Sequence, residues 1–211
     1  MYLPDYFRED RLDVLLAFMR AHPLAMVVSM QAGCPSVDHL PLLVDTSVPT
    51  SLRLRGHVAR ANPLMALVPD AASVLVVFGG ADHYITPAWY AQKAIDGRVV
   101  PTWNYSTVHV HGTLHWVTDA LAVRSLVTDL TDEHEKHRAQ SWAVADAPED
   151  YVASMLKAIV GFEIKITSMV GKFKNSQNKS EADRVGIATG LSQSGLSEVA
   201  VDELLKPRPA F

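Results

Sequence analysis

A cationic, amide-rich turn is the feature of this 211-residue sequence best suited to hold a charged ligand. The stretch 53–63 reads RLRGHVARANP, so a predicted strand ends near Arg60 and a short predicted helix begins at Pro63. Phosphate groups bind backbone N–H groups at a helix start and guanidinium groups that donate two parallel hydrogen bonds. Arg60 and Asn62 are therefore candidate phosphate ligands. The alternative is a surface arginine followed by an asparagine that only caps the helix.

Aromatic side chains with polar tips are concentrated in two further stretches, 83–90 and 100–112. Three of the four tryptophans and three of the six tyrosines fall within residues 84–116. Such side chains suit a planar ligand, and they are equally common in subunit interfaces. For Trp89 and Trp103, packing in the core or between subunits stays open as the alternative.

Several histidines have spacings that resemble metal sites. His109, His111 and His115 share parity on a predicted β-strand, so they point to one face, where imidazoles could bind zinc. A zinc site needs further ligands from elsewhere in the chain, and a polar surface or cleft is the alternative. His134 and His137 are three residues apart, whereas the zinc-protease helix motif needs four, and a solvated helix face is expected there. We predict no metal.

The two common nucleotide-binding fingerprints are absent from the sequence. Gly79-Gly80 lacks the third glycine of a dinucleotide-binding turn. Gly171-Lys172 is followed by Phe173, whereas a phosphate loop needs a hydroxyl residue there. We interpret both glycine positions as turns or bulges.

The single cysteine indicates a reducing compartment. Cys34 cannot form an internal disulfide, and the first five residues, MYLPD, do not begin a signal peptide. Cys34 precedes Pro35 in a predicted turn without an evident base, and no nucleophile elbow is present, so a hydrolase is poorly supported. No apolar run approaches the roughly 18 residues of a membrane-spanning helix. We expect a soluble, cytoplasmic protein without membrane contact.

Composition and charge indicate a globular chain without a general affinity for nucleic acid. The sequence is 48% hydrophobic and 20% charged, and its formal net charge is −4. Its most basic segment, residues 165–184, contains five cationic and two acidic side chains. Lys172 and Lys174 in this segment could face a ligand phosphate, contact DNA, or lie on a solvated strand end.

Hydrophobic periodicity predicts an α+β fold that is mainly β. The early strands imply an antiparallel meander, and we expect an antiparallel β-barrel of about six strands with helices packed outside. The chain is predicted to be one domain, 1–211, with a helical extension at about 180–206. The predicted helices are 10–21, 120–138, 151–160, 180–191 and 196–205, and the predicted strands are 24–30, 37–44, 52–58, 74–78, 102–117 and 162–170.

Several short sequence motifs, spread over nearly the whole chain, occur in the same order as in a known protein family. The sequence resembles the PaiB-type FMN-binding negative transcriptional regulators, whose fold is a flavin-binding split barrel like that of pyridoxamine-phosphate oxidase. The blocks are Tyr6-Phe7, His39-Leu40-Pro41, 56–63, 83–90, 100–112 and 172–184.

The resemblance implies a homodimer with FMN in a cleft between the subunits. It implies that His39 and His57 lie near the flavin, that Arg60 and Asn62 serve the phosphate, and that His109 makes a polar flavin contact. With the aromatic and basic stretches, the candidate cofactor-binding residues are His39, His57, Arg60, Asn62, Trp103, Tyr105, His109, Lys172 and Lys174.

Two functions follow from these expectations. The first is a dimeric FMN-binding negative regulator of transcription, and no helix-turn-helix pair is evident, so indirect regulation fits as well as DNA binding. The second is a flavin-dependent oxidoreductase, in which His109, His57 or Tyr105 could move a proton near the flavin. A barrel that has lost its cofactor and acts through protein contacts is a third possibility.

Overall fold

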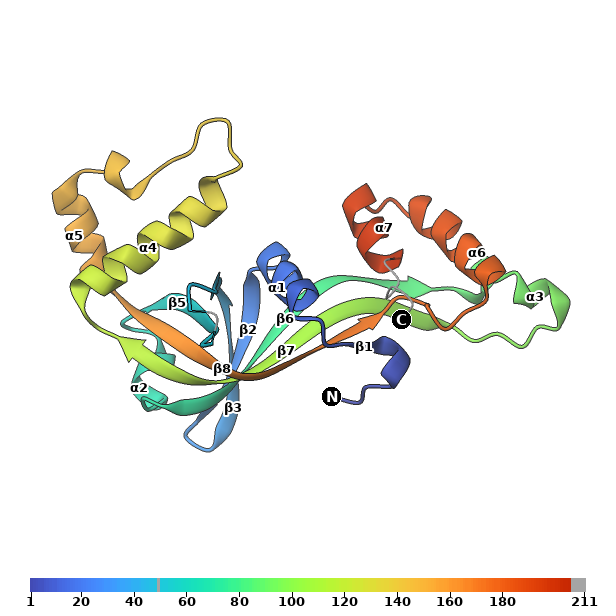
Figure 1. The fold of residues 1–211 in the computed structure, drawn as a ribbon, viewed down its shortest axis with the longest axis horizontal. Coiled ribbons are helices and arrows are strands. Elements are labelled where there is room, and N and C mark those ends of the chain that lie inside the picture. The colour runs from blue at the N-terminus through green and yellow to red at the C-terminus, as the bar shows by residue number, and fades with distance from the viewer. Residues whose placement is uncertain (49, 206–211) are drawn as a thin grey trace. The chain divides into compact units, whose positions relative to one another are not determined.

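Long antiparallel β-strands dominate the computed structural model, which describes residues 1–48 and 50–205 (Figure 1). The strand order is β3-β2-β6-β7-β8-β5-β4, and β1 pairs with β8. The predicted mixed class with a dominant antiparallel sheet is confirmed. The strands are β1 (Arg8–Glu9), β2 (Leu24–Gln31), β3 (Cys34–Pro41), β4 (Leu43–Asp45), β5 (Arg53–Ala59), β6 (Ala72–Ile85), β7 (Thr102–Val117) and β8 (Ile159–Lys174).

Several helices begin where a capping side chain satisfies a free backbone N–H group. Asp119 accepts a hydrogen bond from the N–H of Ala122, and Ser180 accepts one from the N–H of Asp183. The α-helices are α1 (Leu12–Ala21), α2 (Pro63–Leu67), α3 (Gln92–Ile95), α4 (Ala120–Glu135), α5 (Glu149–Lys157), α6 (Glu181–Ser192) and α7 (Glu198–Leu205). Short 3₁₀ helices are η1 (Asp5–Phe7), η2 (Pro87–Trp89) and η3 (Val144–Asp146).

The predicted meander of four early strands is wrong. β2 and β3 form one hairpin and β4 and β5 another, but β2 pairs with β6 whereas β5 pairs with β8. Consecutive strands usually neighbour each other, and that tendency was the basis of the meander. Here the chain forms the β2–β3 hairpin at one end of the strand order and then the β4–β5 hairpin at the other end.

Of the two alternatives for the glycine positions, turns are excluded, whereas bulges stay a prediction. Gly79-Gly80 lies inside β6, and Gly171-Lys172 lies inside β8. A Cβ atom at Gly171 would lie 2.8 Å from a methyl group of Leu15, so this glycine permits a close approach within an extended strand. The predicted helix 151–160 is too long, because β8 already begins at Ile159.

The described residues form two compact units. The first unit contains residues 1–18, 79–108 and 170–205, and the second contains 19–48, 50–78 and 109–169. β6, β7 and β8 contribute residues to both units. The single-domain organisation stays a prediction, and residue 206, at the end of the predicted helical extension, lies outside the described residues.

Helices α6 and α7 cover an apolar cluster in the first unit (Figure 1). Its fully buried members come from β6, from the segment after η2 and from both helices. Trp89 packs against α6, where Gly186 and Gly190 leave room for it. The buried cluster consists of Ile85, Tyr90, Ile187, Leu191 and Leu204.

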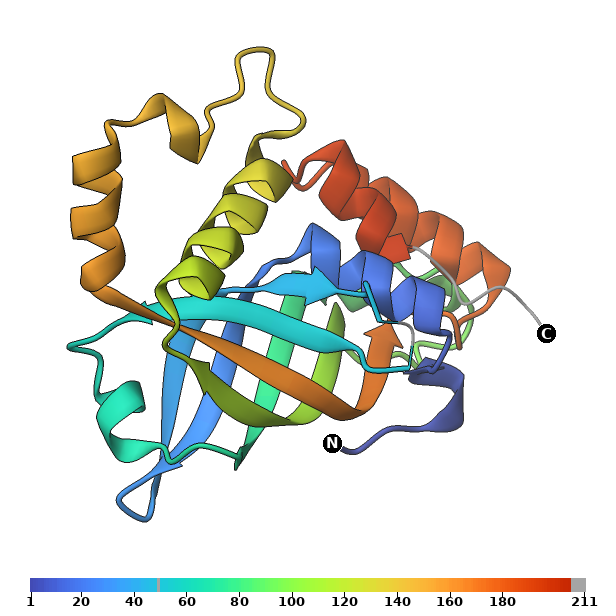
Figure 2. The same ribbon diagram turned by 60° about the vertical axis from the view of Figure 1, so that its left-hand side comes forward.

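Strict alternation along β5 organises the second unit. Leu54 and Val58 are buried on one face, whereas Arg53, Arg55 and His57 share the other face. On that second face, Arg53 binds Asp45 and Glu163 at 2.8 and 2.9 Å, and Arg55 binds Asp129 on α4 at 2.7 Å. α4 packs against β5 and α5 (Figure 2). These ion pairs give both arginines structural partners.

Within residues 1–48 and 50–205, none of the helices is long and apolar enough to cross a lipid bilayer.

Gly186 provides a test of the packing between α6 and η2. A Cβ atom there would lie 2.0 Å from the carbonyl oxygen of Trp89. Alanine normally favours a helix over glycine by about 1 kcal/mol. We nevertheless expect Gly186→Ala to lower the free energy of unfolding by about 1–3 kcal/mol in urea denaturation, because the backbone must shift. Ser192→Ala, an exposed change on the same helix, is the control and should leave stability nearly unchanged. A stabilised Gly186→Ala variant would contradict this packing.

Candidate functional site

Two lysines of β8 approach one tyrosine ring in the first unit. The Nζ atoms of Lys172 and Lys174 lie 5.4 and 5.9 Å from the ring centre of Tyr105 on β7. Lys174 donates hydrogen bonds to the hydroxyl of Thr102 and, at 2.8 Å, to the carbonyl oxygen of Trp103. Lys172 is buried and donates to the carbonyl oxygen of Tyr2 at 3.1 Å. These oxygens are neutral, so they solvate the two ammonium groups without cancelling their charges.

A third lysine, Lys179, contacts a second tyrosine ring in the first unit. The Nζ atom of Lys179 lies 4.6 Å from the ring centre of Tyr90, within the range of a cation–π contact. The hydroxyl of Tyr90 is buried and has no hydrogen-bond partner in the described chain. Burial, followed by the nearby charge of Asp183, raises the pKa of Tyr90. We call Lys172, Lys174, Lys179, Tyr90 and Tyr105 the lysine–tyrosine cluster.

The electrostatics of the cluster favour an anion. Burial lowers the pKa of Lys174, and the charges of Lys172 and Lys179 lower it further. A positive group whose main charged neighbours are also positive is stabilised when an anion binds between them. The lysine–tyrosine cluster can therefore take a phosphate through charge-assisted hydrogen bonds.

Aromatic rings next to the cluster offer flat surfaces. Trp103 is 52% exposed and meets Tyr84 edge to face, with ring centres 5.9 Å apart. His83 and Trp89 are stacked nearly parallel at 6.0 Å. An exposed tryptophan beside a cationic cluster can support a planar ring system.

A set of buried polar side chains holds the end of β8 in place. Ser176 donates to the side-chain oxygen of Asn104 at 2.7 Å, and Asn104 donates to the carbonyl oxygen of Leu204 at 3.1 Å. Asn175 donates to the carbonyl oxygen of Glu203 at 3.0 Å. Buried polar groups are stable only when they are hydrogen-bonded, so this set fixes the chain directly after Lys174. We call Asn104, Ser106, Asn175 and Ser176 the polar anchor.

The predicted histidines lie in the second unit. His39 is exposed on β3, and His57 and His109 are partly buried on β5 and β7. Burial lowers the pKa of both His57 and His109. The Nδ1 atom of His57 is buried without a hydrogen-bond partner in the described chain, which is uncommon for a buried polar atom. Burial therefore favours the neutral form of His57.

Arg60 and Asn62 have local partners. Asn62 caps α2 by accepting from the N–H of Leu64 at 2.8 Å, and its amide donates to Asp38 at 2.9 Å. Asn62 is therefore the N-cap of α2, and a phosphate role for it stays a prediction. Arg60 is exposed, and its Nε donates to the carbonyl oxygen of Lys157 at 2.9 Å. A phosphate role for Arg60 stays a prediction.

The structure brings together four of the nine predicted site residues. Trp103, Tyr105, Lys172 and Lys174 meet in the first unit through the contacts above. The other five belong to the second unit. Sequence reasoning missed Tyr90 as part of the site, although its place in an aromatic stretch was a usable signal.

Metal-binding residues do not cluster. In the part of the chain that the structure describes, no group of three or more His, Cys, Asp or Glu side chains could hold a metal ion. His115, one of the three histidines of equal parity, instead lies 3.3 Å from Asp70.

Comparisons with known proteins identify the family. A family model described as "Putative FMN-binding domain" matches residues 1–168. The chain is 30% identical to "Protease synthase and sporulation protein PAI 2" of Bacillus subtilis over 213 residues, which cover 98% of this chain and 99% of that protein. It is also 30% identical to an uncharacterized protein of Aspergillus fumigatus over 240 residues, with 92% of each chain covered.

Solved structures support the fold. The "FAD and Heme binding protein" of Mycobacterium smegmatis superposes with a TM-score of 0.61 at 16% identity, covering 90% of this chain and 81% of that chain. The "Flavocytochrome Anf3" of Azotobacter vinelandii gives a TM-score of 0.57 at 15% identity, covering 82% and 72%.

Fold and family model together define an FMN-binding protein, and the chain belongs to this FMN-binding family. Within the family it is of the PaiB type, as the full-length match to PAI 2 shows. The predicted family and cofactor, FMN, are confirmed. The residues fit this cofactor, because the lysine–tyrosine cluster suits a phosphate and Trp103 offers a flat surface.

The cluster predicts how FMN affinity should respond to loss of charge. In Lys172→Gln and in Lys174→Gln we expect the Kd for FMN to rise at least about tenfold, because a charge-assisted phosphate contact is lost. Quenching of flavin fluorescence measures this value. Riboflavin has no phosphate, so its affinity should change little.

Lys165→Gln is the matched control, since Lys165 is an exposed lysine elsewhere on β8. Arg60→Gln in the same assay tests the alternative phosphate ligand. Equal losses of FMN and riboflavin affinity in Lys174→Gln would exclude a phosphate contact.

The lowered pKa of His57 predicts part of the acid sensitivity of the fold. An unfolded histidine takes up a proton near pH 6.5, whereas folded His57 does so only at lower pH. Stability is therefore unaffected above about pH 6.5 and falls as the pH drops below it, because the unfolded chain then binds the extra proton. His57→Gln should lose less stability than the wild type between about pH 7.5 and 5.5 in urea denaturation. His39→Gln, at an exposed position, is the control, and an undiminished acid loss in His57→Gln would contradict the assignment.

Proposed function

We propose that the protein is a homodimeric, PaiB-like negative regulator of transcription whose activity depends on bound FMN. The observation that carries the regulatory role is the match to PAI 2 over 98% of the chain. The name of that relative refers to protease synthase and sporulation, and a link to such processes is expected of a protein that controls gene expression.

In this proposal, the lysine–tyrosine cluster binds the phosphate of FMN and Tyr105 with Trp103 supports the ring system. Three ammonium groups lie near two aromatic rings there, and the pKa of Lys174 is lowered by burial and further by the charges of Lys172 and Lys179. Each charge-assisted hydrogen bond to the phosphate would contribute about 1.5–3 kcal/mol. His39, His57, Arg60, Asn62 and His109, all in the second unit, remain proposed FMN contacts.

A split barrel is the proposed form of the sheet in the second unit. β3 and β5 contact each other, although they lie near opposite ends of the strand order. The side-chain bond between Asp38 on β3 and Asn62 after β5 links the same two ends at 2.9 Å. A sheet whose distant strands meet in this way curls toward closure.

The homodimer is supported by an apolar sheet face on the β2–β3 hairpin. Leu24, Met30 and Val37 are 63%, 57% and 49% exposed, and the register of the hairpin puts them on one face with His39. Contiguous exposed apolar patches commonly mark association sites. A second copy covering this face would also bring His39 to the interface, where the family resemblance places the flavin.

Regulation in this proposal acts without strong electrostatic attraction to DNA. The net charge is −4, and the lysines of the most basic segment are occupied by the proposed flavin site. A protein with few free phosphate contacts binds DNA weakly at physiological salt. The flavin state would then affect transcription through a partner or metabolite.

The dimer is tested by placing a charge on the apolar face. Val37→Lys should convert a dimer into a monomer in sedimentation equilibrium at micromolar concentration, since an ammonium group cannot be buried there without a partner. Val199→Lys is the control, because Val199 is 78% exposed on α7, which belongs to the first unit and not to this hairpin. A monomeric wild type would contradict the proposed assembly.

The regulatory role is tested in the natural host. Deletion of the gene should raise the transcript levels of a defined set of genes, and the wild-type gene should restore them. A Lys172→Gln/Lys174→Gln variant should fail to restore them if FMN is required, whereas Lys165→Gln should succeed. Unchanged transcripts after deletion would refute the regulatory role.

A flavin oxidoreductase is the second candidate, and the free Nδ1 atom of His57 favours it. Bound FMN supplies one- or two-electron transfer. A neutral imidazole can hold or accept a proton beside such a cofactor, and burial keeps His57 neutral. Steady oxidation of a reduced nicotinamide by the FMN-loaded protein, slowed in His57→Gln, would support this candidate over the regulator.

A further inference from the structure

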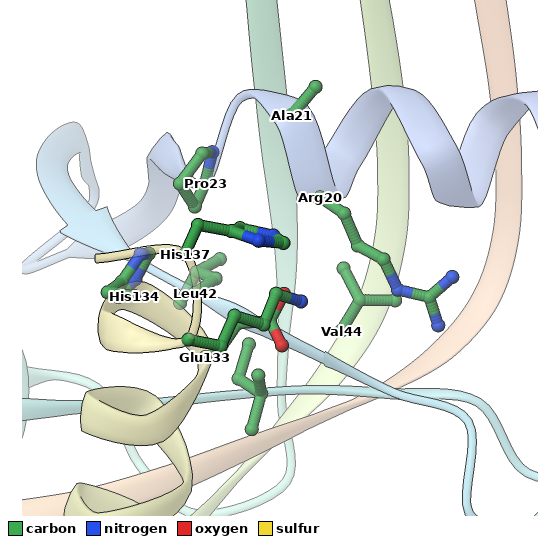
Figure 3. A pocket seen from close by; sticks show the side chains of 10 residues that line it. Arg20, Ala21, Pro23, Leu42, Val44, Glu133, His134 and His137 are labelled. Atoms are coloured by element: carbon green, nitrogen blue, oxygen red, sulfur yellow. The ribbon is translucent and has the colours of Figure 1, made fainter. Parts of the chain in front are cut away.

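A cavity of about 490 Å³ in the second unit is unused by the flavin site (Figure 3). Three parts of the chain line it: the end of α1, the segment around β4 and the end of α4. It shares no residue with the lysine–tyrosine cluster. Its lining residues are Arg20, Ala21, Pro23, Leu42, Leu43, Val44, Glu133, His134, Lys136 and His137.

The floor of this cavity is apolar. Leu42 and Val44 are only 2% and 7% exposed, and Pro23 lies beside them. Leu42 is held by a backbone bond from its N–H to the carbonyl oxygen of Pro23 at 2.9 Å. A fixed apolar floor can accept a flat hydrocarbon body.

The rim carries hydrogen-bond donors and positive charge. Arg20 donates to the hydroxyl of Thr46 at 3.2 Å, a neutral partner that leaves its charge uncompensated. Lys136 is paired with Glu133 at 2.5 Å, so the one carboxylate of the lining already has a cation. Arg20 is therefore the charge that a ligand anion would meet.

Two imidazoles complete the rim. His134 lies in the last turn of α4 and His137 lies in the turn directly after it, and both line the cavity. Figure 3 shows the two imidazoles near the end of α4, with Glu133 between them and the guanidinium of Arg20, which extends from α1 on the other side. A cation near a helix C-terminus stabilises the helix by about 0.3–1 kcal/mol. This effect accounts for a cation at the end of α1, Arg20, and for one at the end of α4, Lys136. Helix stabilisation does not account for the two imidazoles of His134 and His137 beside the apolar residues Leu42 and Val44.

We propose that this cavity is a second ligand site that binds a small organic carboxylate with a flat apolar body. Arg20 binds the carboxylate, His134 and His137 donate hydrogen bonds or stack on the flat body, and Leu42 and Val44 contact its underside. A regulatory effect of this ligand rests on the proposed function of the protein as a regulator. Binding of the ligand to the cavity does not depend on that function.

Benzoate is the probe, and isothermal titration of the FMN-loaded protein is the measurement. Benzoate should bind at one site, and neutral benzamide should bind at least about fivefold more weakly, because it lacks the charge that Arg20 meets. Arg20→Gln should weaken benzoate binding by a similar factor. Inorganic phosphate, which lacks an apolar body, should not compete at equal concentration.

Arg138→Gln is the matched control, since Arg138 lies next to the lining, pairs with Glu135 and is not part of the cavity. It should bind benzoate as the wild type does. The inference is overturned if no saturable binding occurs up to about 10 mM benzoate, if Arg20→Gln binds unchanged, or if phosphate competes equally. Flavin content and oligomeric state are recorded for each variant, so a failure of the proposed function is seen separately.

Discussion

The polar anchor is the constraint on which the first unit depends. Asn104, Ser106, Asn175 and Ser176 are at most 4% exposed and bond with one another and with the backbone of α7. Leaving one such group unpaired costs about 1–3 kcal/mol, so the four side chains are fixed as a set. Ser176 even accepts a left-handed backbone, with φ of 58°, to take its place. The same contacts fix β8 where its two lysines approach Tyr105.

The two faces of a strand carry side chains with different roles. On β5, one face forms the apolar core while the other carries ion-paired arginines and the partly buried His57. Arg53 and Arg55 therefore stabilise the sheet, whereas the lysines of β8 bond to neutral oxygens and stay available to an anion. Similar cationic residues thus have different roles because their partners differ.

Periodicity and capping predicted most elements, and family blocks predicted the cofactor. Asp119, Asn62 and Ser180 cap their helices with their own side chains, and such capping depends on local chemistry. The predicted meander was wrong because the strand order depends on pairing between residues far apart in the sequence, which no local pattern encodes. Lys172 and Lys174 were identifiable from charge, but their contact with Tyr105 depends on how β7 and β8 are aligned. The apolar floor beneath His134 and His137 was hidden for the same reason.

The only thiol of the sequence stands at the tip of the β2–β3 hairpin, where Cys34 is exposed. Side chains alternate along β3, so Cys34 and the apolar Val37 point to opposite sides of the strand. A maleimide dye attached to Cys34 would therefore label every chain once and leave the apolar side uncovered. Energy transfer between two dyes of different colour could then follow the meeting of two protomers in real time, without any engineered residue.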